Sequence, residues 1–181
     1  PVPGERFDLI LSNPPFVITP ESHLLLRDSG VRGDMFCKEL LRQSSEFLRE
    51  GGVCQMLANV PHHRQRPWMD EVASWCEDLG CDALVLNLRQ QAIDDYAMMW
   101  IVATESQNPR EVPAIFERWM AFYERQAIED MVYVLIVLRR RDAGDTWCVV
   151  DREVTSIAGS CGAELTQRLA TLAILHHLHD E

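Results

Sequence analysis

The chain of 181 residues is long enough for one domain with a substantial core, and its 47% of hydrophobic residues is ordinary for a globular protein. Its formal net charge of −11 argues against a protein that binds nucleic acid through a generally basic surface, although a local basic patch is compatible with it. No apolar run approaches the roughly 20 residues that span a bilayer, and no secretory signal is visible, so we expect no membrane contact and a cytoplasmic location.

The first part of the chain alternates between strand and helix patterns. The predicted elements are a buried strand at 6–12, a helix at 35–49, a strand at 53–60, a helix at 68–79 and a strand at 82–88. Asp34 is expected to cap the first helix, and Gly51 and Gly52 are expected to end it. Loops are expected at 17–33 and 61–67. This order is typical of a parallel sheet with crossover helices.

The second part of the chain departs from that alternation. Its predicted elements are helices at 94–104 and 111–127, strands at 131–140 and 147–154, and a helix at 163–178. The two helices at 94–104 and 111–127 form an insertion of about 91–129 before the strong apolar strand MVYVLIVLRR. Residues 141–181 then form a C-terminal appendage.

A stiff polar turn follows the first strand, in the stretch FDLILSNPPF. Pro14 and Pro15 fix their own φ angles and cannot donate hydrogen bonds, so the turn is rigid. The Asn13 side-chain oxygen and the Pro14 carbonyl could accept the two hydrogens of a planar amino group, which would free its lone pair. Phe16 could stack on the same flat target. Because Asn-Pro-Pro also occurs in plain turns, the motif alone has moderate specificity.

Together with the alternation after it, this stretch resembles the fourth strand and the [NDS]-P-P-[YFW] motif of class I S-adenosylmethionine-dependent amino-methyltransferases. The group is related to release-factor glutamine methylases and ribosomal-RNA methylases, and one branch shares SNPPFVI, a following RDSG and a helical insertion. The resemblance covers about 6–140 and implies a Rossmann-like α/β sheet of parallel strands with 131–140 as a reversed strand. It also implies S-adenosylmethionine as cofactor. The implied catalytic residues are Asn13, Pro14, Pro15 and Phe16, with Asn13 also beside the cofactor.

The sequence departs from this family in one respect. A glycine-rich turn after the first strand of the family's sheet holds the cofactor, but no G-x-G occurs here. We therefore expect residues 1–140 to be the C-terminal half of a methyltransferase domain, with the main cofactor pocket elsewhere and the isolated chain inactive. The strand at 6–12 would then be a sheet edge that pairs with another chain or with the missing N-terminal half.

The target is expected at the carboxyl ends of the parallel strands, where ligands bind in such sheets. The candidate substrate-binding residues are His62, His63, Arg64, Arg66, Arg27 and Arg32. They could contact phosphates, or they could be ordinary solvated residues. This basic loop and the phenylalanine of the motif, where glutamine methylases usually have tyrosine, favour a nucleic-acid amino group, in RNA rather than DNA. The acidic balance favours the alternative, a protein glutamine amide. A methyltransferase-like module that binds without catalysis is the third interpretation.

The other candidate residues give weaker indications of function. The insertion should overhang the active site. Its aromatic residues Trp119, Phe122 and Tyr123 are nevertheless expected to pack in the core and not to bind the target. The six cysteines contain no C-x-x-C pair and are expected to be reduced. His176, His177, His179 and Asp180 at the C-terminal end are poorly spaced for a closed metal site, so no metal is expected.

Overall fold

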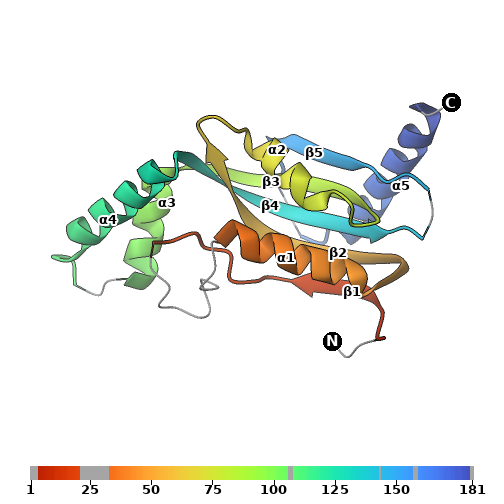
Figure 1. Ribbon diagram of the computed structural model, residues 1–181, viewed down its shortest axis with the longest axis horizontal. Coiled ribbons are helices and arrows are strands. Elements are labelled where there is room, and N and C mark those ends of the chain that lie inside the picture. The colour runs from red at the N-terminus through yellow and green to blue at the C-terminus, as the bar shows by residue number, and fades with distance from the viewer. Residues whose placement is uncertain (1–3, 21–32, 106–107, 143, 157–158, 180–181) are drawn as a thin grey trace.

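Over the residues that the computed structural model describes, the chain forms one five-stranded mixed sheet in the order β1-β2-β4-β3-β5 (Figure 1). The described residues are 4–20, 33–105, 108–142, 144–156 and 159–179. The strands are β1 (Phe7–Ser12), β2 (Leu48–His63), β3 (Cys81–Ala92), β4 (Ile128–Arg140) and β5 (Cys148–Val154). The helices are α1 (Gly33–Glu46), α2 (Trp68–Cys76), α3 (Ile93–Trp100), α4 (Val112–Arg125) and α5 (Gly162–His179), and a π-helical turn, η1 (Ile101–Glu105), follows α3.

The strand directions confirm the predicted fold class. β1 runs parallel to β2, and β3 runs parallel to β5. β4 lies between β2 and β3 and is antiparallel to both, so it is the reversed strand predicted at 131–140. Helices α3 and α4 lie between β3 and β4 in the chain, and β5, in the stretch predicted as an appendage, joins the sheet at the outer edge of β3.

Two predictions about β2 are wrong. The helix before it ends at Glu46, and Gly51 and Gly52 lie inside the strand instead of ending the helix. Gly51 has a φ of +71°, which favours glycine, and a Cβ at Gly52 would lie 2.8 Å from the Phe7 carbonyl oxygen. This close approach accompanies an irregularity in the pairing, which shifts from Phe7 opposite Leu48 to Leu9 opposite Val53. β2 also continues to His63, into the loop predicted at 61–67.

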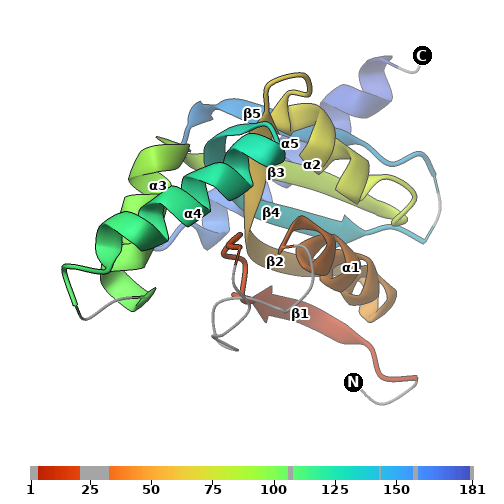
Figure 2. The same cartoon turned by 60° about the vertical axis from the view of Figure 1, so that its left-hand side comes forward.

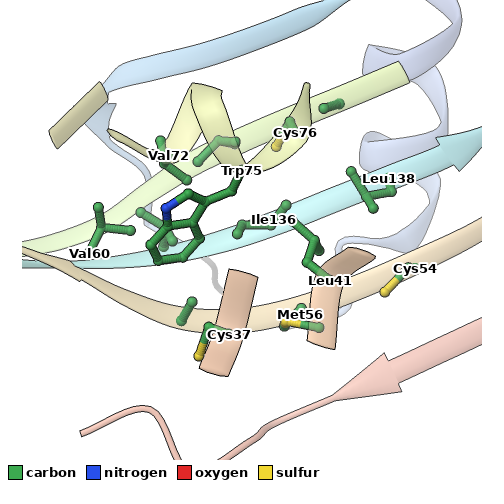
Figure 3. Packing of buried hydrophobic residues seen from close by; sticks show 14 of the residues in the cluster. Cys37, Leu41, Cys54, Met56, Val60, Val72, Trp75, Cys76, Ile136 and Leu138 are labelled. Carbon is green, nitrogen blue, oxygen red and sulfur yellow. The ribbon is translucent and has the colours of Figure 1, made fainter. Parts of the chain in front are cut away.

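Helices cover both faces of the sheet. α1 and α2 lie on one face, where Trp75 of α2 packs with Leu41 of α1 and with Met56 and Ile136 of the sheet (Figure 3). On the opposite face, Leu165 and other apolar residues of α5 cover β3 and β4. Burying these side chains is the main favourable contribution to the fold. Among the described residues, no helix is long and apolar enough to cross a membrane.

A third apolar cluster lies beyond one end of the sheet. It is built by α3, η1 and α4, which come between β3 and β4 in the chain and lie side by side (Figures 1 and 2). Trp119 and Tyr123 of α4 are buried in it, as the sequence predicted for packing residues. Val17 and Ile18, which follow the proline turn, belong to the same cluster. The insertion is therefore packed against the motif segment and not only against the sheet.

β1 is an edge strand within the described residues, since it pairs with β2 alone. Ile10 packs against the α1 side, but the side chains on the other face are uncovered: Leu9 is 54% exposed and Leu11 is 68% exposed. The prediction of a buried strand is therefore wrong for the isolated chain, because burial depends on a neighbour that β1 lacks here. Its position at the edge is as expected.

Candidate active site

The turn Asn13-Pro14-Pro15-Phe16 directly follows β1. Pro14 is buried and Pro15 is partly buried, so the turn is anchored by its prolines. The side chain of Asn13 is exposed and makes no hydrogen bond within the described residues. Its amide is therefore free to bind a ligand. Phe16 is partly buried. It packs against the apolar cluster beneath α1 and α2 and against the cluster formed by α3, η1 and α4, so only part of its ring is available for stacking.

The turn shares one edge of the sheet with the connections that leave β2 and β3. β1, β2 and β3 are parallel to one another, because β2 and β3 are both antiparallel to β4 and β1 is parallel to β2. Their carboxyl ends therefore lie at the same edge. The proline turn leaves β1 there, residues 64–67 leave β2, and α3 leaves β3.

Hydrogen bonds join the motif segment to the insertion. The Ile18 N–H donates to the Tyr96 hydroxyl over 3.1 Å, and the Tyr123 hydroxyl donates to the Ile18 carbonyl over 2.7 Å. The Asn59 side-chain nitrogen also donates to the Tyr96 hydroxyl, over 3.0 Å. Sequence reasoning missed Tyr96 and Asn59. The available signal was their polarity within apolar stretches, because buried tyrosine and asparagine side chains need hydrogen-bond partners.

The predicted basic loop is an ordered turn with paired charges. His63 and Arg66 form a β-bridge, and the Arg64 N–H donates to the Ala127 carbonyl. The side-chain contacts are His62 Nδ1 to Asp130 at 3.8 Å, His63 Nδ1 to the Gln126 carbonyl at 2.9 Å, Arg64 Nε to Glu129 at 2.9 Å and Arg66 Nη1 to Glu71 at 2.6 Å. Both arginines are therefore neutralised by carboxylates within the chain.

The remaining candidates lie either outside the described residues or at the C-terminal end of the chain. Arg27 and Arg32 lie outside the described residues. His176 and His177 lie near the end of α5, whereas the side chain of His179 and residue Asp180 are outside the described part. Among the residues described, no group of three or more His, Cys, Asp or Glu could hold a metal ion.

The residues present fit S-adenosylmethionine only in part. Asn13 offers a free amide at the edge where a ligand would bind. However, the sequence holds no glycine-rich turn of the kind that would approach the cofactor closely. Asn13 is therefore a candidate contact for this cofactor, and the sequence supplies no glycine-rich turn that would complete a pocket for it.

No family model and no curated protein matches the sequence. The fold is similar to solved structures at low identity. An enzyme assigned as a sarcosine dimethylglycine methyltransferase from Galdieria sulphuraria is 12% identical, with a TM-score of 0.36 over 78% of this chain and 56% of that one. The [4+2]-cyclase SpnF is 14% identical, with a TM-score of 0.37 over 79% and 53%.

A phosphoethanolamine N-methyltransferase from Haemonchus contortus, solved with S-adenosylhomocysteine, is 12% identical, with a TM-score of 0.38 over 75% of this chain and 34% of that one. The chain thus spans between 34% and 56% of the length of these structures. A likeness of this degree does not identify a function, and one of the three structures is a cyclase.

Proposed function

We propose that this chain provides the target-binding half of an S-adenosylmethionine-dependent N-methyltransferase that acts on a planar amino group. The observation that carries the proposal is the Asn13-Pro14-Pro15-Phe16 turn, which has a free Asn13 amide and lies at the carboxyl edge of parallel strands. Its sequence resembles the amino-methyltransferase motif, and its position is where ligands bind in such sheets.

The proposed mechanism follows from the acceptors in the turn. An amino group attached to a π system is a weak nucleophile because its lone pair is delocalised. The Asn13 side-chain oxygen and the Pro14 carbonyl would accept its two hydrogens and favour a tetrahedral nitrogen with a localised lone pair. The two prolines keep both acceptors in place, so the catalytic contribution is positioning and preorganised electrostatics. S-adenosylmethionine, when bound, would supply an electrophilic methyl group: the S–CH3 bond would break as the N–CH3 bond forms, and the amino nitrogen would then release one proton to solvent.

The remaining part of the cofactor pocket is proposed to dock at β1. Within the described residues, the outer edge of this strand has no strand partner, and the Leu9 and Leu11 side chains are exposed, so both backbone groups and apolar surface are left to be covered. A polypeptide segment that continued the sheet beyond β1 would satisfy both. It would also bring its own strand ends to the edge that carries Asn13.

The first candidate target is the amino group of a nucleobase, in RNA more than in DNA. Phe16 supports it, because bases stack on aromatic side chains. His62, His63, Arg64 and Arg66 would be the phosphate contacts in this proposal. Arg64 and Arg66 would then exchange Glu129 and Glu71 for phosphates. The exchange is inexpensive for Arg64, because exposed ion pairs contribute only about 0.2–1 kcal/mol.

The second candidate target is a protein glutamine amide. The ion pairs of Arg64 and Arg66 favour it, because the described part of the site then presents little free positive charge to a polyanion. The net charge of −11 points the same way. The amide of glutamine is also planar and would fit the same two acceptors.

One experiment separates these candidates. The intact gene product is incubated with methyl-labelled S-adenosylmethionine and a lysate of cells that lack it. The product is then divided between ribonuclease and protease. Label released by ribonuclease supports a nucleobase, and label released only by protease supports an amide. Bound cofactor with no label in either fraction contradicts catalysis and supports a binding module.

The role of Asn13 is tested by Asn13→Ala in the same assay. We expect kcat to fall by about 10²–10³, the loss expected for one preorganised polar group. Gln167→Ala is the matched control, because Gln167 is an exposed amide on α5. An effect of Asn13→Ala below about threefold would contradict the proposed role.

A further inference from the structure

Ile18 is held through both of its backbone polar groups by the helical insertion. Its N–H donates to Tyr96 of α3, and its carbonyl accepts from Tyr123 of α4. Both tyrosines are completely buried, and Ile18 itself is buried. Hydrogen bonds of this kind normally belong to a regular helix or sheet, but here two side chains more than seventy residues away in the sequence provide them.

Tyr96 is itself fixed by its surroundings. Asn59, near the end of β2, donates to the same hydroxyl, and Asn59 is buried. The Tyr96 ring also makes edge contacts with Tyr123 and Trp100, with ring centroids 6.3 and 6.4 Å apart, and a tilted contact with Tyr133 at 6.1 Å. The Tyr96 hydroxyl, which accepts the hydrogen bond from the Ile18 N–H, is therefore part of a rigid cluster that joins β2, α3 and α4.

The prolines make this anchor necessary. Pro14 and Pro15 have no N–H, so the turn cannot fix its own position through their amides. On one side, β1 holds it through the pairing of Ser12 with Met56 of β2. On the other side, the first backbone hydrogen bonds to side chains of another element are those of Ile18. The short segment between β1 and Ile18 runs from β1 toward α3 (Figure 1). It is therefore held at both of its ends, by the pairing of Ser12 and by the hydrogen bonds of Ile18.

We propose that Tyr96 and Tyr123 are positioning residues for the Asn13–Phe16 turn, and that the insertion is thereby part of the active site. This inference rests on the proposed function of Asn13. Reaction centres must be held to within about 0.5 Å, and a misplacement of about 1 Å can cost a hundredfold in rate. If the two tyrosines only filled the core, loss of their hydroxyls would leave the turn where it is.

Phenylalanine substitutions test the hydroxyls with little change in packing. Tyr96→Phe removes the acceptor of the Ile18 N–H, and Tyr123→Phe separately removes the donor to its carbonyl. Tyr133→Phe is the matched control, because Tyr133 lies in the same aromatic cluster but its hydroxyl donates to Gln91. Either of the first two variants suffices if the other does not fold.

The first readout needs no activity. In nitrogen-edited NMR spectra of the chain, we expect the Asn13 side-chain signals and the Phe16 and Val17 amides to shift in Tyr96→Phe and Tyr123→Phe. We expect the amides of Phe16–Ile18 to exchange with deuterium at least about tenfold faster, because they lose a buried anchor. In Tyr133→Phe these signals should stay as in the wild type. Unchanged Asn13 signals and exchange in both test variants would overturn the inference, whatever the activity.

The second readout is the methyl-transfer assay of the intact gene product. We expect Tyr96→Phe to lower kcat by about 10- to 100-fold with little change in the KM for S-adenosylmethionine. A purely structural role would change the urea midpoint and leave kcat intact. Full kcat in Tyr96→Phe overturns the inference, whereas an inactive wild type contradicts the proposed function and leaves the NMR result to decide the positioning role.

Discussion

Arg139 and Asp82 form a partly buried ion pair between β4 and β3, near the carboxyl end of β4 and the start of β3. The two residues are direct partners on β4 and β3, and Arg139 Nη2 lies 2.7 Å from Asp82 Oδ2. The Asp82 side chain is only 1% exposed. Arg141 approaches the same oxygen at 3.8 Å. Because a carboxylate at this depth has little access to water, the guanidinium groups replace the solvation that it lacks.

We therefore expect Arg139→Met to destabilise the chain by about 3 kcal/mol, the low end of the range for an orphaned buried charge, since Arg141 remains nearby. Urea unfolding at neutral pH measures the change. The matched control is Asp82→Leu with Arg139→Met, which removes both charges and is expected to lie near wild type. A single variant that loses less than about 1 kcal/mol would show that the pair is solvated in solution.

The elements themselves were predictable because their signals are local. The proline turn is a contiguous signature after an apolar strand, and the order of strands and helices follows from hydrophobic periodicity. The Ile18–Tyr96 contact joins residues 78 positions apart, and the Arg64–Glu129 contact joins residues 65 apart. Such contacts depend on the assembled fold, which is why the sequence did not reveal Tyr96, the hydrogen bond of Tyr123 to Ile18 or the ion pairs of the basic loop.

The errors in β2 and β1 have a different cause. Gly51 and Gly52 carry the same local signal whether they end a helix or permit a close strand crossing, and only the position of Phe7 distinguishes the two. The exposure of Leu9 depends on what lies beyond the sheet edge, which an alternating pattern does not specify.

Cys148 is expected to be more reactive than the buried thiols of Cys54, Cys76 and Cys81. A hydrogen bond from the Cys76 thiol lowers the pKa of Cys148, and the same contact together with burial raises the pKa of Cys76. Burial raises the pKa of both Cys54 and Cys81 to about 11. Since the thiolate is the nucleophile and Cys148 is exposed, it should react first.

Iodoacetamide labelling at pH 8, followed by peptide mass spectrometry, measures this order. We expect Cys148 to react at least about tenfold faster than Cys54 and Cys81. Cys76→Ala, which removes the hydrogen-bond donor, should slow the labelling of Cys148. Equal labelling of Cys148 in the wild type and in Cys76→Ala would argue that the thiol contact has no influence on its pKa.

The uncovered strand β1 is expected to make the isolated chain self-associate. Leu9 and Leu11 are exposed on one face, and the outer backbone groups of β1 have no strand partner among the described residues. Leu9→Lys with Leu11→Lys should reduce association, because charged side chains on an edge oppose strand pairing. Sedimentation velocity over a range of protein concentrations measures the change.

Ile174→Lys with Leu178→Lys is the control for this experiment. These residues of α5 are 62% and 64% exposed, so the variant adds the same charge and removes a similar exposed apolar surface away from the strand. We expect the α5 variant to associate as the wild type does. If the two double variants reduce association equally, the association is due to exposed apolar surface in general and not to pairing at the edge of β1.

The paired Arg64 gives a test of the nucleic-acid target that needs no cofactor. In the nucleobase proposal, Arg64 must leave Glu129, to which it is bound at 2.9 Å, before it can contact a phosphate. Glu129→Gln removes this competition. Because exposed pairs contribute about 0.2–1 kcal/mol, we expect the affinity for a short single-stranded RNA to rise by about 1.5- to 5-fold at low salt. The gain should shrink as salt is added, since phosphate contacts are screened.

Glu153→Gln on β5 controls for the change in net charge, because its side chain is exposed and it lies at the far side of the sheet from β2. We expect this variant to alter RNA affinity less than Glu129→Gln does. Fluorescence anisotropy with a labelled RNA measures both variants under the same conditions. If both variants raise the affinity equally, the affinity depends only on the net charge of the protein, and Arg64 is not a phosphate contact. If neither binds RNA, the glutamine amide becomes the favoured target, because the basic loop has then failed as a phosphate-binding feature.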